Sequence, residues 1–302
     1  MSERYPKIRL SSQGDHLLVR DGLAIRFIMH RTHREFAPAV VRALEAFIQA
    51  IRPATLGWCP DMEGDWQEVD DRAWEGIRKE LLEWERQYVT LANRPDGVPE
   101  FQFQYSGTSL EETGPLDEPG RACLATFWLP TEFLEEHGPR RVRELALELA
   151  TFLPFNSGYA SLSFNALHQL VGVTGRVADM CFRYPGMDVL WEFISHDIGT
   201  RIPGAYWLTF LGQPVLRELG GVDGLRARLS SPGTTVQQLE AERAVVTLGQ
   251  WPDAGDLEAG RDLPAYRELA RVLEPWLYRD PGRIGGAFGP ADRHRWERRF
   301  LD

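Results

Sequence analysis

Three neighbouring residues, Ser195, His196 and Asp197, are of the types that act together in serine hydrolases. In such enzymes the histidine takes the proton of the serine, the aspartate holds the histidine, and the three side chains converge through hydrogen bonds. Residues that follow one another along a chain project in different directions. The chain also has no Gly-x-Ser-x-Gly turn to hold a strained nucleophilic serine. The sequence therefore argues against a catalytic triad.

His30, His33 and Glu35 are the best candidates for metal ligands, because imidazole and carboxylate groups both bind divalent cations. Arg31 and Arg34 lie between them, and their positive charges oppose a bound cation. This pattern favours a solvated polar turn. A metal-dependent hydrolase that uses these three residues stays open as the enzymatic alternative.

Other cofactor sites are not indicated. The glycine-rich run 282–289 lacks the lysine pattern and the strand-to-helix setting of a phosphate-binding loop. The three cysteines, Cys59, Cys123 and Cys181, are far apart, which predicts buried free thiols and not a disulfide framework or a zinc site. We therefore expect no catalytic residue, no metal and no cofactor.

An acidic segment is the most distinctive feature of the chain. Six carboxylates lie between Asp61 and Asp71 with no basic residue among them, and the glycine placement and the closing glutamate of a calcium-binding EF-hand loop are missing. The segment is either a solvated loop that caps the next helix through Asp70 or Asp71, or a docking face for a basic partner with tryptophan anchors. The docking interpretation predicts partner contacts at two acidic loops, namely Trp58, Asp61, Glu63, Asp65, Trp66 and Glu68 in one, and Glu111, Glu112, Asp117 and Glu118 in the other.

Apolar periodicity predicts the elements that position these residues. We expect a strand pair over 16–29 with its turn at Asp21 and Gly22, and helices over 37–51 and 74–91. Further strands are predicted at 101–105, 122–129, 157–165, 205–211 and 243–248, and further helices at 131–138, 142–154, 166–182 and 264–277. Trp74, Trp84, Trp128, Trp207 and Trp276 fall on apolar stripes or strands and are predicted in the core, which leaves Trp58, Trp66 and Trp251 for exposed contacts.

These elements interleave without the cadence of a doubly wound fold. They favour an α+β fold of mostly antiparallel sheets covered by amphipathic helices, in one bilobed globular body. The predicted organisation is an N-terminal segment 1–14, a domain 15–280 with a lobe boundary near 108–121, and a Gly-rich, charged tail 281–302.

Composition limits the partners. The chain has 302 residues, 43% of them hydrophobic, and a formal net charge of -10, which repels nucleic-acid phosphates and favours a basic partner. The N-terminus lacks the apolar stretch of a secretory signal, and no segment approaches the ~20 apolar residues of a membrane span. We expect a cytoplasmic protein that binds neither nucleic acid nor membranes directly.

Six segments without catalytic character follow one another along the chain: LPTEFLEEHGP (129–139), LPFNSGYASLSFN (153–165), FRYPGMDV (182–189), GAYWLTFLG (204–212), LRELGG (216–221) and AVVTLGQWP (244–252). In order and spacing they resemble the TsiV-like family of type VI secretion immunity proteins, over roughly residues 15–280. Ser161 departs from the pattern, which leads us to expect a glycine there. Each segment is explained by turns, apolar strands or helix starts, so the resemblance concerns the fold.

The resemblance implies an immunity protein that binds and neutralises a cognate antibacterial effector toxin, in several relatives a nuclease. An acidic surface suits that partner, because a nuclease presents a basic groove to DNA. The resemblance does not transfer interface residues, and it leaves the oligomeric state open. An adaptor or chaperone that carries an effector to the secretion machine is the remaining non-enzymatic alternative.

Overall fold

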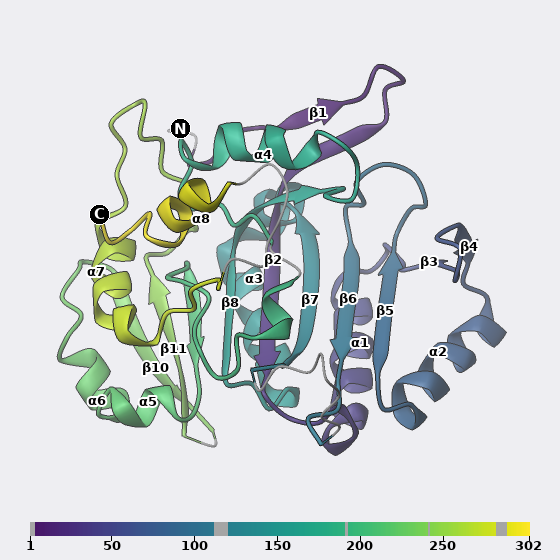
Figure 1. The fold of residues 1–302 in the computed structure, drawn as a ribbon, viewed down its shortest axis with the longest axis horizontal. Coiled ribbons are helices and arrows are strands. Elements are labelled where there is room, and N and C mark those ends of the chain that lie inside the picture. Colours follow the sequence, from purple (N-terminus) through teal and green to yellow (C-terminus); the bar gives the residue numbers. More distant parts are fainter. Residues whose placement is uncertain (1–3, 112–119, 191–192, 241, 282–288) are drawn as a thin grey trace.

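A single antiparallel sheet runs through the molecule (Figure 1). The computed structural model describes residues 4–111, 120–190, 193–240, 242–281 and 289–302. Within these ranges the sheet has eleven strands in the order β10-β11-β9-β8-β2-β7-β6-β5-β3-β4, with β1 paired to β2 off this path, which confirms the α+β prediction. The strands are β1 (Arg9–Ser11), β2 (Leu17–Met29), β3 (Trp58–Pro60), β4 (Trp66–Glu68), β5 (Gln87–Ala92), β6 (Gln102–Gly107), β7 (Cys123–Pro130), β8 (Ser157–Ala166), β9 (Leu208–Leu211), β10 (Thr234–Leu239) and β11 (Arg243–Leu248).

The central strand β2 separates an apolar surface from a polar one. Leu23, Ile25 and Phe27 point to one side, where they are fully buried in the main core. Arg26 points to the other side and is also buried, with its Nε donating to the Thr126 hydroxyl at 3.0 Å. Both faces of the sheet centre are therefore buried, one by apolar side chains and the other by polar ones.

The predicted turn at Asp21 and Gly22 is wrong, because both residues lie inside the continuous strand β2. The Asp21 carboxylate is buried and accepts hydrogen bonds from the Ile8 backbone N–H at 2.7 Å and from the Thr131 hydroxyl. A Cβ at Gly22 would lie 2.4 Å from the Asn165 side-chain nitrogen, so this position requires glycine for close packing. The chain reverses earlier, between β1 and β2.

Two long helices cover the apolar face and lie behind the sheet in Figure 1. They are α1 (Ala37–Ala50) and α3 (Thr131–Phe152). α3 is kinked at Gly138, which has a φ of 76° and is followed by Pro139, at the place where the sequence predicts a break between two helices. The remaining helices are α2 (Asp71–Glu83), α4 (Val173–Cys181), α5 (Val215–Glu218), α6 (Gly221–Arg226), α7 (Pro264–Leu273) and α8 (Pro290–Glu297), with 3-10 turns η1 (His33–Glu35), η2 (Phe193–His196) and η3 (Glu274–Trp276).

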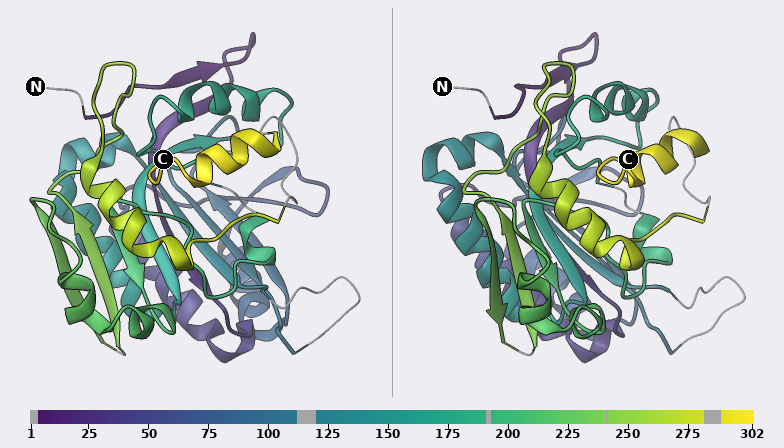
Figure 2. Two further views of the ribbon diagram at one scale, coloured as in Figure 1. Left: turned by 60° about the vertical axis from the view of Figure 1, so that its left-hand side comes forward. Right: turned by 90° about the vertical axis from the view of Figure 1, so that its left-hand side faces the viewer.

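Helices α4, α7 and α8 lie on the opposite, polar side of the sheet (Figure 2). The sequence predicts a charged tail after residue 280, yet the described residues 289–302 pack against the body. Trp296 and Phe300 are 2% and 3% exposed, and they join the main apolar cluster. The C-terminal segment therefore contributes to the folded core.

The predicted helix over 74–91 is correct only in its first part. α2 ends at Glu83, and Gln87–Ala92 form β5, which pairs residue by residue with β6. Tyr88 and Leu91 match the helical spacing of α2, but Val89 and Thr90 are β-branched and the pairing with β6 decides the conformation.

None of the helices in the described ranges is long and apolar enough to cross a membrane. The three cysteines are free, and Cys123 and Cys181 are buried as predicted, whereas Cys59 is half-buried. Burial raises the pKa of Cys123 to about 11, so this thiol stays protonated at neutral pH.

Candidate binding surface

The acidic segment forms a small hairpin, made by β3 and β4, at one end of the sheet. Trp58 pairs with Glu68 and Pro60 pairs with Trp66, so these four side chains share one face of the hairpin. Trp58 also pairs with Ala92 of β5, which joins the hairpin to the sheet. In the sheet order β4 is the last strand, on the right-hand side of Figure 1.

Asp61 holds the tip of this hairpin in shape. Its carboxylate accepts hydrogen bonds from the backbone N–H groups of Glu63 and Asp65, both at 2.9 Å, and from the Gln67 amide at 2.8 Å. These bonds, above all the one from Gln67, lower the pKa of Asp61 from its ordinary value. Asp61 is therefore a structural residue of the loop, while Glu63 and Asp65 are exposed.

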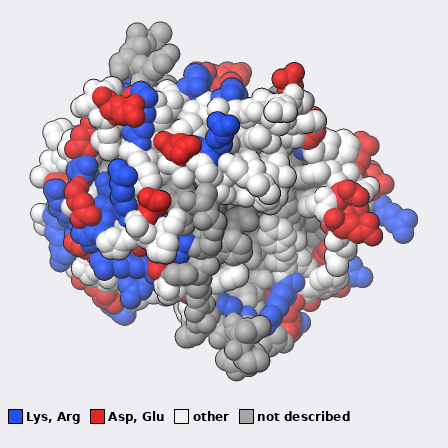
Figure 3. Space-filling view, turned by 45° about the horizontal axis from the view of Figure 1, so that its top comes forward, with Lys and Arg blue, Asp and Glu red and all other residues white. Residues whose placement is uncertain are grey.

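Negative charge is concentrated around the hairpin. Residues 45–85 contain eleven Asp and Glu but four Lys and Arg, whereas residues 261–302 contain seven and nine respectively. In Figure 3 carboxylates gather on the right-hand side, where the hairpin lies in Figure 1, and the left-hand side carries mixed charges. We call residues 45–85 the acidic end of the molecule.

Large apolar side chains are exposed in the same region. Of seven such side chains in the described residues, three belong to the acidic end: Met62, Leu82 and Trp84. Trp84, predicted in the core, is 55% exposed because α2 stops one residue before it. Met62, at the hairpin tip, is fully exposed and was not predicted as a contact. Apolar side chains rimmed by charge are typical of protein interaction surfaces.

A groove lies between α1, the hairpin and the first turn of α2. Its apolar lining is Ile48, Leu56, Trp58, Val69 and Trp74, and its acidic lining is Glu45, Glu68, Asp70 and Asp71. Asp70 caps α2 by accepting a hydrogen bond from the Ala73 N–H at 2.7 Å, which confirms the predicted cap. Of the predicted contact residues, the groove brings Trp58 and Glu68 together.

The second predicted acidic loop starts elsewhere. Glu111 follows β6 beyond Gly107, which pairs with Gln87, whereas the hairpin joins β5 at Ala92. These two ends of β5 are ~17 Å apart at about 3.4 Å per residue. Glu111 is exposed but is not part of the acidic end, and Glu112, Asp117 and Glu118 lie outside the described residues.

The described contacts of Ser195 and Asp197 are with residues outside a catalytic triad. His196 is exposed, while the Asp197 carboxylate accepts a hydrogen bond from the Tyr278 hydroxyl at 2.5 Å. The backbone carbonyl of Ser195 accepts from the Ala122 N–H at 2.8 Å. These contacts hold the residues around η2 against Ala122, just before β7, and against Tyr278, just after η3, which is a structural role.

His33, the central residue of the alternative metal site, is buried with both ring nitrogens engaged. Nε2 lies 2.8 Å from the Leu81 carbonyl, which can only accept, so Nε2 carries the hydrogen and Nδ1 accepts from the Tyr105 hydroxyl at 2.7 Å. His30 Nδ1 lies 2.7 Å from the Arg121 carbonyl. Across the described ranges no three potential metal-binding side chains cluster. The structure therefore does not support the metal-dependent hydrolase.

Burial gives His33 a measurable effect on stability. It lowers the pKa of His33, although the Leu81 carbonyl partly opposes the shift. Above pH ~6.5 the imidazole is neutral in both folded and unfolded chains; below it the unfolded chain binds a proton that the folded chain resists. We expect the free energy of unfolding to fall more steeply below pH ~6.5 in the wild type than in His33→Gln. Urea unfolding between pH 7.5 and 5 measures both slopes, with His196→Gln as the exposed control, and equal slopes would contradict the assignment.

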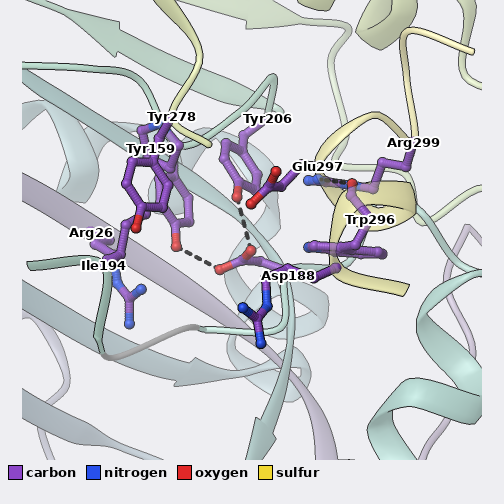
Figure 4. Close-up of a pocket in the computed structure, with 11 residues that line it drawn as sticks. Arg26, Tyr159, Asp188, Ile194, Tyr206, Tyr278, Trp296, Glu297 and Arg299 are labelled. Atoms are coloured by element: carbon purple, nitrogen blue, oxygen red, sulfur yellow. Dashed lines mark hydrogen bonds between the residues drawn. The ribbon is translucent and has the colours of Figure 1, made fainter. Parts of the chain in front are cut away.

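A polar network lies on the opposite face of the sheet, beneath α8. Asp188 is 2% exposed and accepts hydrogen bonds from the Tyr159 hydroxyl at 2.5 Å, the Tyr206 hydroxyl at 2.9 Å and the Leu190 N–H at 3.2 Å. The two tyrosine rings are stacked with centroids 3.9 Å apart, and Figure 4 shows both hydroxyls directed at the carboxylate. Burial is the main cause that raises the pKa of both phenols, so they remain hydrogen-bond donors.

The network is built from three of the family-like segments. Tyr159 belongs to LPFNSGYASLSFN, Asp188 to FRYPGMDV and Tyr206 to GAYWLTFLG. Ser161, the departure from the expected glycine, donates a hydrogen bond to the Gly186 carbonyl at 3.1 Å and so keeps two of these segments together. The three family-like segments therefore meet around Asp188, near β8 and β9, and several strands separate them from the acidic end at β3 and β4.

Comparisons with known proteins cover most of the chain, including the acidic end. No curated protein matches the chain. Among solved structures, the T6SS protein PA0821 of Pseudomonas aeruginosa is similar, with a TM-score of 0.80 and 18% identity over 99% of this chain and 88% of that one. This likeness shows a common fold. The sequence profile of the TsiV family, described as type VI immunity for VRR-NUC, matches residues 39–300. Because that match spans most of the sequence, the chain belongs to the TsiV family of type VI immunity proteins for VRR-NUC.

Proposed function

We propose that this immunity protein neutralises its VRR-NUC nuclease effector by covering the surface with which the nuclease contacts DNA. The acidic end supplies the contact, through Trp58, Glu63, Asp65, Trp66 and Glu68, while Asp61 maintains the loop that presents them. Neutralisation takes place in the cytoplasm, where the effector meets DNA. Membership of an immunity family implies a non-enzymatic role, so one inhibitor acts on one effector without turnover.

The coincidence of negative charge and exposed apolar side chains at the acidic end carries this proposal. A nuclease presents positive charge to the phosphate backbone, so carboxylates compete with DNA for the same surface and speed the encounter between the two proteins. Charge alone gives modest affinity, whereas aromatic and other apolar anchors that become buried supply most of the binding energy. The acidic end offers both contributions side by side.

A cleavage assay tests the mechanism. Purified effector nuclease is titrated with this protein before labelled duplex DNA is added, and cleavage is expected to stop at one inhibitor per nuclease. A catalytically inactive effector is expected to lose DNA binding when the immunity protein is present, because occlusion makes the two ligands mutually exclusive. Bovine serum albumin at equal concentration controls for non-specific effects.

The outcomes separate the rival functions. A ternary complex of DNA, effector and this protein in which cleavage is blocked would contradict occlusion, because inhibition would then act at a distance from the DNA site. A stable complex that cleaves DNA at the full rate would favour the adaptor or chaperone.

A further inference from the structure

The groove at the acidic end has the chemistry of a site for one inserted side chain. Ile48 comes from α1, Trp58 from β3 and Trp74 from α2, and all three are only half-buried. Three separate elements therefore leave their apolar side chains partly exposed to one hollow. Such a hollow between rigid elements is where an interface anchor gains most from desolvation.

Carboxylates also line this groove. Glu45 lies on α1 and forms an ion pair with Arg78 at 2.5 Å, while Glu68 is exposed on β4. Asp70 and Asp71 complete the acidic lining at the start of α2. The tryptophan faces and the carboxylates both attract a guanidinium or ammonium group.

We infer that the groove receives an exposed segment of the effector that carries one large apolar side chain flanked by Lys or Arg. This inference rests on the proposed function and assigns its main anchor point. The apolar side chain contacts Trp58 and Trp74, and the flanking cations meet Glu68, Asp70 and Asp71. Charge complementarity selects this occupant, since residues 45–85 hold eleven acidic and four basic residues.

Hydrogen–deuterium exchange locates the contact without a mutation. The wild-type protein is compared alone and in complex with the inactive effector. Protection is expected in peptides that cover 45–49, 55–58 and 68–74. Peptides of β10 and α6, at the far edge of the sheet, serve as the internal control.

Point variants then separate the anchor from general charge. We expect Trp58→Ala to weaken binding at least tenfold, mainly through faster dissociation, because it removes one of the two tryptophans that line the groove. Trp251→Ala, at a half-buried tryptophan outside the acidic end, is expected to bind within threefold of wild type. Glu68→Lys is paired with Glu136→Lys, which makes the same charge change at an exposed site on α3. Thermal unfolding of each variant checks that folding is retained.

Three results would overturn the inference. Protection confined to other segments, or wild-type affinity in Trp58→Ala, would exclude the groove, and continued inhibition of DNA cleavage in the same preparation would leave the proposed function intact. Sedimentation that shows a dimer of the free protein, dissociated by Trp58→Ala, would identify a second copy of this chain as the occupant.

Discussion

Replacement of Glu63 and Asp65 by lysine is expected to slow the association of this protein with its effector about tenfold at low ionic strength. Both carboxylates are exposed at the hairpin tip, so their field reaches a basic partner before contact. The dissociation rate is expected to change much less, because exposed charges contribute little once the partners have docked. Stopped-flow or biolayer measurements at 20–300 mM salt test this, since the difference from wild type should shrink as screening increases.

The control for this experiment must make the same change in net charge. Glu136 and Glu148 are exposed on α3, on the helical side of the molecule, and their replacement by lysine is expected to leave association nearly unchanged. Equal slowing in both double variants would show that only total charge matters. Asp61 is deliberately left intact, because its carboxylate holds the loop through Glu63, Asp65 and Gln67 and its loss would confuse charge with structure.

The elements that could be predicted from the sequence are those whose pattern of apolar residues fits only one kind of secondary structure. The apolar stripe of α1 ends before Pro53, and in β8 Ala160, Leu162 and Phe164 alternate with Tyr159, Ser161 and Ser163, so both elements were identified correctly. Asp21-Gly22 and 84–92 were misassigned because their local pattern allows two structures. Packing against Asn165 and pairing with β6, both distant in sequence, decide between them.

The candidate site was predictable in charge but not in shape. The run of acids predicted an acidic loop but not the strands β3 and β4 that flank its tip. The groove also needs Ile48 and Trp74 from two helices, and their meeting with Trp58 is a consequence of tertiary packing. Met62 did carry a signal, as the one apolar residue between Asp61 and Trp66 in a polar loop. Composition could not show that the Asp61 carboxylate binds backbone N–H groups of its own loop, and a partner contact at Asp61 stays a prediction.

The proposed function gives the family-like segments and the acidic end separate tasks. Tyr159, Asp188 and Tyr206 lie in the scaffold near the middle of the sheet, whereas Trp58 and Glu68 lie at its edge. An immunity family needs a constant fold that presents a variable recognition surface, because each member must match its own effector. On this view, changes to the Asp188 network affect stability, and changes to the acidic end affect recognition.

Asp188→Ala is accordingly expected to cause the largest loss of stability of any substitution considered, about 3–5 kcal/mol. It leaves two buried phenol hydroxyls without their acceptor, removes the carboxylate from the pocket that Arg26 also lines, and opens space under α8. Tyr206→Phe removes one donor and leaves the others, so a loss of about 1–2 kcal/mol is expected. Asp188→Asn keeps one acceptor oxygen and should fall between the two. Urea unfolding gives the order of the free energies of unfolding, and a loss below about 1 kcal/mol in Asp188→Ala would contradict the prediction.

The decisive companion measurement is effector affinity at a temperature where each variant is folded. Because the Asp188 network lies away from the hairpin, Tyr206→Phe should bind as wild type does. Trp58→Ala, in contrast, should bind weakly and unfold normally.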